Sequence, residues 1–228
     1  LVAIAGGTAY VWRHPLPLRE LIAPVIPATP RVAVMPFAAP DGDAELGALA
    51  RAFEAHVHEW LRTDPKLAVV SRERVHDALA RTAPGVSGDA LAKLMPNVIS
   101  AAGATRSLVG NLKRDGSNLE LDLIWTNPDG AGTPRSIAVK GADAAAIFAS
   151  YSKTLADAFR SEGVRVGAPP PIAPSALAAF GRGLVALDQH HPEQATTELS
   201  AVAQTPPPSA LIALNLLDAQ EQGHQDLP

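Results

Sequence analysis

Two histidines in the stretch "HVHEW" have side chains that could bind a metal ion. His56 and His58 are two residues apart, and a helix turns by about 200° over that spacing, so their rings leave it in opposite directions. Glu59 follows His56 at helical spacing and could meet it, but two ligands are fewer than a zinc site requires. We therefore expect His56, His58 and Glu59 to lie on the solvated edge of a helix.

Two further groups carry nucleophilic or acid–base side chains. Ser150 and Lys153 have the S-x-x-K spacing of serine acyl enzymes, but the S-D-N and K-T-G partner motifs are absent, and Tyr151 is expected to point inward. Glu120 and Asp122 alternate along one face of an expected strand, where two carboxylates could serve as acid and base. Such alternation is also typical of the solvent face of an antiparallel sheet, which is the simpler interpretation.

His190 and His191 are adjacent at an expected turn between two helices. Paired with His76 or His224 they could respond to pH, because histidine titrates near neutral pH. An ordinary polar turn is the simpler interpretation of the pair.

The turn "FAAPDGD" (37–43) connects an expected strand to a helix, a position at which many proteins bind phosphate. It has neither of the glycine patterns of phosphate-binding loops, and its acidic residues would repel an anion. We expect Asp41 or Asp43 to cap the helix that follows.

These groups do not assemble a nucleophile, a base and an orienting residue. We therefore assign no catalytic, cofactor-binding or metal-ligating residue, and we expect that the protein is not an enzyme. An envelope hydrolase whose residues converge only in the fold is the alternative that sequence leaves open.

The charge and the cysteine content exclude several classes of function. The 228 residues include 19 Lys and Arg against 23 Asp and Glu, a formal net charge of -4, with no basic run. Nucleic-acid binding needs clustered cations, so we expect no nucleic-acid partner. The absence of cysteine excludes disulfides, thiolate catalysis and Cys-ligated zinc.

Hydrophobic periodicity predicts the elements that position these side chains. Apolar residues from Leu46 to Leu61 recur at helical spacing and predict a helix that faces a core. Alternation and the dipeptide Asp115-Gly116 predict a hairpin of strands 107–112 and 119–125, followed by a turn at 127–132. We also expect strands at 31–37, 67–70 and 135–140, and helices at 71–83, 88–102 (broken or kinked at Pro96) and 143–163. This order fits one mixed sheet with helices against it, and its first β-α-β unit should be parallel.

The N-terminal residues differ in composition from the rest. Residues 1–14 begin with the uncharged apolar stretch "LVAIAGGTAYVW", which as a helix would rise about 18 Å, less than the bilayer core of about 30 Å. We interpret them as the remnant of a membrane span; the end of a signal peptide and a buried apolar element are the alternatives. Residues 15–30 contain five prolines and are expected to form an extended tether.

Residues after a second Pro-rich stretch at 167–174 have the pattern of helices. Two short helices are expected around His190-His191-Pro192, and a third is expected after them. These residues match part of the tetratricopeptide pattern. Gly183 and Ala195 stand at its small positions, Leu199 at a large position and Pro207 at its proline. Ala179 and Ala186 stand where a bulkier residue is usual.

The predicted fold is an α/β (α+β) domain with one mixed sheet of about five strands, residues 31–166. The linker 167–174 and a small all-α tetratricopeptide-like helical unit, residues 175–228, follow it.

Three stretches of the α/β region resemble the TolB-N-terminal-like domain. They are "RVAVMPF" (31–37), "KLAVVSRERV" (66–75) and "GATRSLVGNLKRDGSNLELDLIW" (103–125). The family pattern is a V-x-P-F strand, a long amphipathic helix, a "vvsR" strand and a "Ga-x-x-lv-G" strand before a hairpin. The matching residues are Val34, Pro36, Phe37, Val70, Ser71, Arg72, Gly103, Ala104, Leu108, Val109 and Gly110. The resemblance covers about residues 31–162.

That domain occurs in the extracytoplasmic halves of CadC-type transmembrane regulators and of bacterial receptor kinases and cyclases. The resemblance implies a periplasmic sensor anchored in the inner membrane by its N-terminal segment, with signal transduction to a cytoplasmic winged-helix or kinase domain. Such a module would bind an unknown small ligand or an envelope protein, and it could form a homodimer. The alternative is an envelope protein-interaction adaptor without signalling output, whose helical unit docks a partner helix.

Overall fold

The structure is a computed structural model, and it describes residues 29–85, 88–126 and 134–225. The expected membrane-span remnant (1–14), most of the expected tether (15–30) and the expected turn at 127–132 lie outside the described residues.

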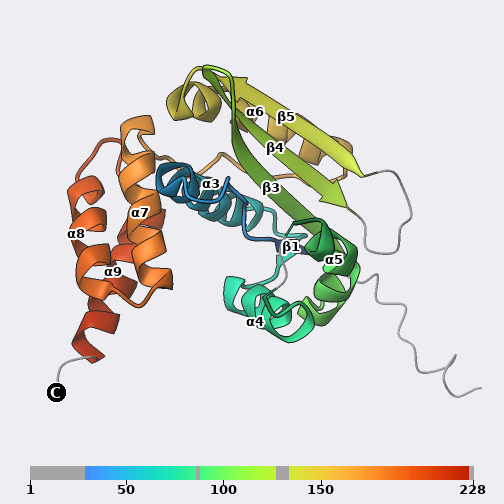
Figure 1. The fold of residues 1–228 in the computed structure, drawn as a ribbon. Coiled ribbons are helices and arrows are strands. Elements are labelled where there is room, and N and C mark those ends of the chain that lie inside the picture. The colour runs from blue at the N-terminus through green and yellow to red at the C-terminus, as the bar shows by residue number, and fades with distance from the viewer. Residues whose placement is uncertain (1–28, 86–87, 127–133, 226–228) are drawn as a thin grey trace, which may run out of the picture.

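One five-stranded sheet forms the centre of the α/β region, with the strand order β2-β1-β3-β4-β5 (Figure 1). Strand β1 is parallel to its neighbours β2 and β3, whereas β3, β4 and β5 form an antiparallel meander. The mixed sheet and the parallel first β-α-β unit predicted from sequence are therefore confirmed. The strands are β1 (Arg31–Val34), β2 (Ala68–Val69), β3 (Arg106–Asp115), β4 (Asn118–Thr126) and β5 (Arg135–Gly141).

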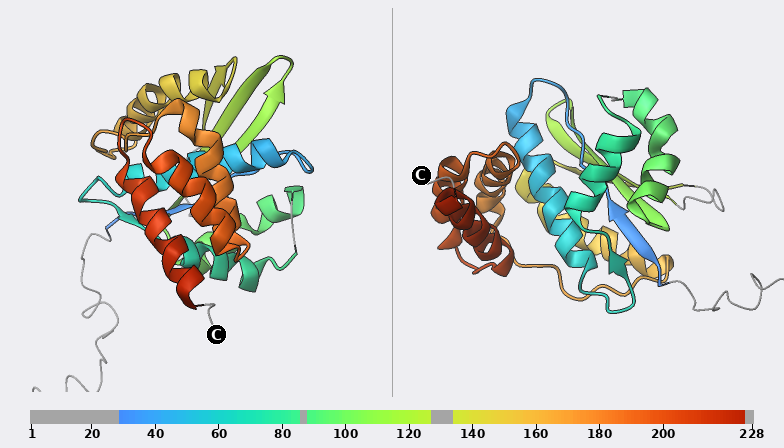
Figure 2. Two further views of the ribbon diagram at one scale, coloured as in Figure 1. Left: turned by 90° about the vertical axis from the view of Figure 1, so that its left-hand side faces the viewer. Right: turned by 90° about the horizontal axis from the view of Figure 1, so that it is seen from below.

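Helices cover the sheet on both faces because alternate side chains of each strand point to opposite sides. Val32 and Val34 pack into one core with helices α3 (Ala44–Leu61) and α6 (Ala144–Ser161). Ala33 and Met35 pack into a second core with α4 (Arg72–Thr82) and α5 (Gly88–Ala102). Helices α4 and α5 lie beside β1 and β2 (Figure 2) and leave the same face of β4 and β5 open. That open part of the face carries charged residues.

Helix α3 begins and packs as its sequence predicts. The Asp43 carboxylate accepts a hydrogen bond from the backbone N–H of Leu46 at 3.0 Å, which caps the helix. This hydrogen bond, together with the nearby Arg114, lowers the pKa of Asp43 below its usual value. All members of the predicted apolar stripe are buried: Leu46, Leu49, Ala50, Phe53, Val57, Trp60 and Leu61.

Two local expectations need correction. Helix α5 runs through Pro96, so the predicted break is wrong, whereas a kink at Pro96 stays a prediction. The hairpin strands β3 and β4 are longer than predicted, because their pairing continues to Asp115 and Asn118 on either side of the tight turn. Gly116 in that turn has φ +62°, a conformation that glycine adopts without strain.

The C-terminal part is helical, as predicted, and consists of η1 (Pro174–Ala176), α7 (Leu177–Asp188), α8 (Pro192–Ala203) and α9 (Ala210–Gln225). The break between α7 and α8 falls at His190 and His191. A Cβ atom at Gly183 would lie 2.7 Å from Cγ of Leu199, so these two positions interlock as a small and a large residue.

The helical unit packs directly on α3. A Cβ atom built on Gly181 of α7 would lie 1.9 Å from the carbonyl oxygen of Ala48, so the two helix backbones are in contact. Phe180 and Leu184 belong to the same apolar core as Phe53 of α3. Helix α7 therefore lies as a further layer on the α/β region (Figure 1).

The linker between α6 and η1 is hydrogen-bonded to the end of α3 and the turn that follows it. The indole Nε1 of Trp60 donates to the Gly167 carbonyl at 2.8 Å, and the Gly167 N–H donates to the Thr63 hydroxyl at 2.7 Å. The Arg165 N–H donates to the Asp64 carboxylate at 2.7 Å. These bonds fix the Pro-rich segment, so it does not act as a free joint between the two parts.

We expect Gly181→Ala to destabilise the protein by about 1–3 kcal/mol, because the new methyl group must push α7 away from α3. The matched control is Gly47→Ala within α3, where a Cβ atom meets nothing within 4 Å. Because alanine favours a helix over glycine, this control should be stabilising by up to about 1 kcal/mol. Urea unfolding measures both changes, and a neutral Gly181→Ala would contradict the close contact.

Candidate functional site

The structure separates His56 from His58, as their spacing predicts, but it corrects the expectation of a solvated helix edge. His56 is fully buried between α3 and α6, because an aromatic cluster of Phe53, Trp60, Phe148 and Tyr151 surrounds it. His58 is half-buried, and its Nε2 donates to the Val70 carbonyl at 3.1 Å. Glu59 pairs with Arg62 at 3.2 Å.

The partners of His56 show that it is neutral and structural. Its Nε2 lies 2.7 Å from the Pro170 carbonyl, which can only accept, so this nitrogen carries the proton. Its Nδ1 accepts from the Tyr151 hydroxyl. Burial lowers the pKa of His56 to about 4 and raises the pKa of Tyr151 well above its usual value. Both ring nitrogens are thus used to hold α3, α6 and the linker together.

The Ser150-x-x-Lys153 spacing lies on α6 without an arrangement for acyl transfer. The Ser150 hydroxyl donates back to the Ala146 carbonyl at 3.0 Å, and Lys153 is exposed. Tyr151 points into the core, as predicted from the sequence.

Glu120 and Asp122 form part of a charge ladder across the open face of the meander. Lys113 contacts Asp122 at 2.6 Å and Glu120 at 3.6 Å, and Lys140 contacts Glu120 at 3.4 Å and Asp115 at 2.8 Å. The lysines and carboxylates on this face pair with one another across the strands. This supports the interpretation that Glu120 and Asp122 belong to the solvent face of the sheet.

His76 on α4 and His190 in the turn between α7 and α8 reach the same surface groove. His191 precedes α8, and His224 lies in the last turn of α9. Among the residues that the structure describes, no group of three or more His, Cys, Asp or Glu is placed to hold a metal ion.

The groove that holds His76 and His190 is open to solvent and has a volume of about 580 Å³. We call it the α4–α9 groove, because α4 forms one wall, α9 and the end of α7 form the other, and α3 forms the base. Its lining residues are Arg51, Glu54, Ala55, His58, Glu59, Arg62, Arg72, Glu73, His76, Asp77, Leu187, Asp188, His190, Leu211, Leu214, Asn215, Asp218 and Gln222.

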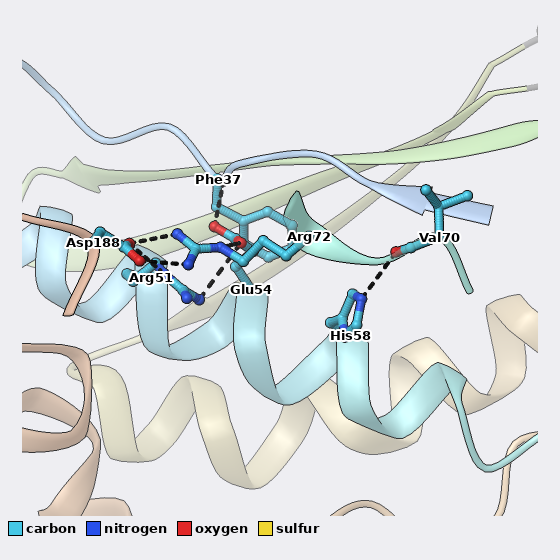
Figure 3. A network of polar contacts seen from close by, with 7 residues as sticks. All are labelled: Phe37, Arg51, Glu54, His58, Val70, Arg72 and Asp188. Carbon is cyan, nitrogen blue, oxygen red and sulfur yellow. Dashed lines mark hydrogen bonds and ion pairs between the residues drawn. The ribbon is translucent and has the colours of Figure 1, made fainter. Parts of the chain in front are cut away.

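Four charged side chains join the walls of the groove at its inner end. Arg72, the first residue of α4, contacts Glu54 of α3 at 3.1 Å and forms two hydrogen bonds to Asp188 at the end of α7. Arg51 contacts the same two carboxylates, at 3.5 Å to Glu54 and 3.0 Å to Asp188. Figure 3 shows Arg72 extended between Glu54 and Asp188, with Arg51 beside them.

Electrostatics within the network favours the charged forms of Asp188 and Arg72. Burial alone would raise the pKa of Asp188, but the hydrogen bonds and charges of Arg72 and Arg51 outweigh it, so this pKa is lowered. Burial would lower the pKa of Arg72, but Asp188 and Glu54 outweigh it and raise this pKa. Both shifts favour an ionised pair of Arg72 and Asp188, whereas burial lowers the pKa of Arg51. The contacts of the network tie α3, α4 and α7 together.

Several residues of the TolB-N-terminal-like pattern have structural roles beside this network. The backbone N–H of Phe37 donates to Glu54 at 3.3 Å, and Ser71 caps α4. A Cβ atom at Gly110 would lie 2.4 Å from the Phe37 ring, so only glycine fits under that ring. Arg72 belongs to the network described above. These residues of the TolB-N-terminal-like pattern therefore stabilise the packing around α3 and α4.

Sequence reasoning did not single out Arg51, Glu54 or Asp188, nor the leucines of α9. One signal was present: Glu54 lies between Ala50 and Val57 at helical spacing, inside the apolar stripe of α3. A second was present in "ALIALNLL", which has more leucine and isoleucine than one helix face can bury.

Comparison with protein-family models finds no match, and comparison with curated proteins finds none either. Among solved structures, LpoB from Escherichia coli has 17% identity and a TM-score of 0.38, over 50% of this chain and 56% of the LpoB chain. Lipoprotein GNA1162 from Neisseria meningitidis has 10% identity and a TM-score of 0.38, over 57% of this chain and 96% of that one. TolB from Acinetobacter baumannii has 14% identity and a TM-score of 0.29, over 47% of this chain and 22% of TolB.

The chain thus spans 56% of the length of the LpoB chain that it matches. Because these identities and TM-scores are low, no ligand, partner or site residue is transferred from these proteins.

The expectation of a CadC-type transmembrane regulator in signal transduction is wrong. The similar structures are those of LpoB, a lipoprotein and TolB, and a CadC-type sensor or signalling protein is not among these. Across residues 29–85, 88–126 and 134–225, no helix combines the length and hydropathy that crossing a membrane requires.

We expect Asp188→Asn to lower the free energy of unfolding by about 2 kcal/mol, because two arginines lose a shared carboxylate. The control is Asp157→Asn on α6, whose carboxylate pairs with Arg160 at 2.7 Å while both side chains are more than half exposed. Removing an exposed pair should change stability by less than about 0.5 kcal/mol. Equal effects of the two substitutions in urea unfolding would show that the network does not hold the walls together.

We expect the buried His56 to make stability depend on pH. Its pKa is about 4 in the folded chain against 6.5 in the unfolded chain, so the unfolded chain takes up a proton first on acidification. The contribution of His56 is complete above about pH 6.5 and declines by about 3 kcal/mol as pH falls to about 4. In His56→Gln, unfolding between pH 7 and pH 4 should show a correspondingly weaker pH dependence; an unchanged dependence would contradict the assignment.

Proposed function

We propose that this chain is a protein-interaction adaptor of the bacterial cell envelope, which binds a helical segment of its partner in the α4–α9 groove. The observation that carries this proposal is a pair of exposed leucines beside the groove. Leu214 is 61% exposed and Leu217 is 55% exposed, and they are neighbours on the surface of α9.

The two leucines have no role in the packing of α9 itself. Ile212 and Ala219 are buried, whereas Leu214 and Leu217 point away from that contact. Burying one exposed leucine contributes about 1.5–3 kcal/mol, and a few such residues supply most of the energy of a protein interface. A partner helix that covers both leucines would therefore gain a substantial apolar contact.

The groove is also fixed before a partner arrives. Asp188, on one wall, is bonded to Arg72, on the other, and both contact α3 at the base through Arg51 and Glu54. A preformed surface loses little conformational freedom on binding, which favours affinity.

The lining of the groove favours a protein over a small molecule. Small-molecule pockets are lined mainly by apolar and aromatic side chains with a few polar groups. Here half of the lining residues are charged, and the described lining contains no Phe, Tyr or Trp. Its apolar members are Ala55, Leu187, Leu211 and Leu214. The proposal includes no catalytic step, and it makes the adaptor alternative the better supported one.

The location in the envelope is also part of the proposal. It is supported by the resemblance to the TolB-N-terminal-like domain, which occurs in extracytoplasmic protein regions. Residues that match the pattern of this domain include Phe37, Arg72 and Gly110. A chain without cysteine is compatible with an oxidising compartment.

We expect the folded chain to capture one stoichiometric partner from the envelope fraction of the bacterium that encodes it. The double variant Leu214→Asp/Leu217→Asp should lose at least tenfold in captured partner, because charged side chains replace the apolar contact. Affinity capture with quantitative mass spectrometry measures this.

The control is Ile124→Asp, which changes a residue that is 41% exposed on the open face of the sheet, away from the groove. This variant should capture the partner as the unchanged chain does. Capture of no partner, or equal capture by the Leu214/Leu217 variant with its helical circular dichroism intact, would refute the adaptor function.

A further inference from the structure

The acidic residues of the α4–α9 groove fall into two sets. Glu54 and Asp188 are neutralised by Arg51 and Arg72, and Glu59 is paired with Arg62. The second set comprises Glu73 and Asp77 on α4 and Asp218 on α9, which have no ion-pair partner within the part of the chain that the structure describes. The groove therefore has uncompensated negative charge on both walls.

An apolar strip accompanies these charges. Leu211 and Leu214 line the groove, and Leu217 continues the strip at the same spacing of three residues along α9. Asp218 is one helical turn beyond Leu214, so the strip has a carboxylate at its edge. Glu73 and Asp77 are likewise one turn apart on the facing wall.

We propose that the α4–α9 groove binds a cationic amphipathic helix, with leucine-like residues against the α9 strip and Lys or Arg on its flanks. This inference rests on the adaptor function and specifies the chemistry of its partner. Basic side chains on one flank reach Glu73 and Asp77, and those on the other reach Asp218. None of these three carboxylates forms an ion pair within the part of the chain that the structure describes, and the arginines that line the groove are already paired with Glu54, Glu59 and Asp188.

The shape of the groove favours a helix as the occupant. Its base and walls are the helices α3, α4, α7 and α9, and no strand of the sheet contributes to its lining. An extended peptide that adds to a sheet needs an open strand edge, which this groove does not offer. Helix surfaces accept the i, i+3, i+4, i+7 anchors of an amphipathic helix.

A second copy of this chain is a poor occupant. Helix α9 contains no Lys or Arg, and its acidic residues are Asp218 and Glu221. Two α9 helices placed against each other would bring carboxylates together next to Glu73 and Asp77, and like charges at an interface disfavour the pairing. The charge distribution thus selects a basic partner over self-association.

The test uses a fluorescein-labelled synthetic helix of about 18 residues, about five turns, with leucines at i, i+3, i+4 and i+7 and lysines on both flanks. Two matched peptides replace the lysines by glutamates, or scramble the order at fixed composition. We expect fluorescence anisotropy to show the amphipathic lysine peptide binding at least tenfold more tightly than either. Its affinity should also fall when NaCl is raised from about 50 to about 300 mM.

The matched protein variants separate local charge from net charge. Glu73→Gln/Asp77→Asn/Asp218→Asn should weaken binding of the lysine peptide at least tenfold. The control Asp41→Asn/Glu45→Gln/Asp157→Asn changes net charge equally at exposed positions outside the groove and should leave affinity within twofold. Equal weakening by both triple variants would overturn the proposal, because it would show a non-specific attraction.

Binding of the scrambled or glutamate peptide as tightly as the lysine peptide would also overturn it. Failure of this inference is distinguishable from failure of the adaptor function. If the chain captures an envelope partner through Leu214 and Leu217 while the lysine peptide does not bind, the adaptor function stands and the cationic helix is wrong. Sedimentation velocity of the free chain tests whether a second copy of the chain occupies the groove. A dimer that Leu214→Asp abolishes would show that the occupant is a second copy and would overturn the proposal of a basic partner.

Discussion

Burial of helix α3 on several sides is the constraint on which the rest of the structure depends. The helix packs on the sheet, on α6 through the ring of Tyr151, and on α7 at the backbone contact between Ala48 and Gly181. The buried polar side chains of a helix in this position need partners, because an unpaired buried charge costs several kcal/mol. Glu54 and His56 are therefore bonded on opposite sides of α3, Glu54 to arginines and His56 to neutral groups.

The way in which these polar groups are satisfied fixes the elements around α3. Glu54 is held by Arg72, and Arg72 in turn holds Asp188, so the first turn of α4 and the last turn of α7 have defined places. His56 and Trp60 hold the Pro-rich linker by its carbonyls, so the chain enters the helical unit in one direction. The helical unit is consequently a packed layer of the structure, and its groove is formed without a partner.

Periodicity was sufficient to predict the elements, because apolar spacing and turn residues are local. The stripe of α3, the Asp115-Gly116 hairpin and the mixed sheet follow from such signals. The groove could not be predicted in this way, since Arg72 and Asp188 are 116 residues apart and meet only through the packing of α7 on α3. The solvated placement of His56 was wrong for a related reason: helical spacing gives the direction of a side chain, but only tertiary structure shows that α6 lies there.

The division of charges within the groove bears on how a partner would be selected. The deep charges are already paired with one another, so they contribute rigidity and little attraction, and they would penalise a partner that disrupted them. The shallow acids, Glu73, Asp77 and Asp218, are exposed and form no ion pair among the described residues, so a basic partner would add Coulomb energy to them. Exposed leucines bind many apolar surfaces, whereas carboxylates on both walls exclude acidic ones, so the leucines supply affinity and the acids supply discrimination. A surface arranged in this way distinguishes partners by charge without changing its own conformation.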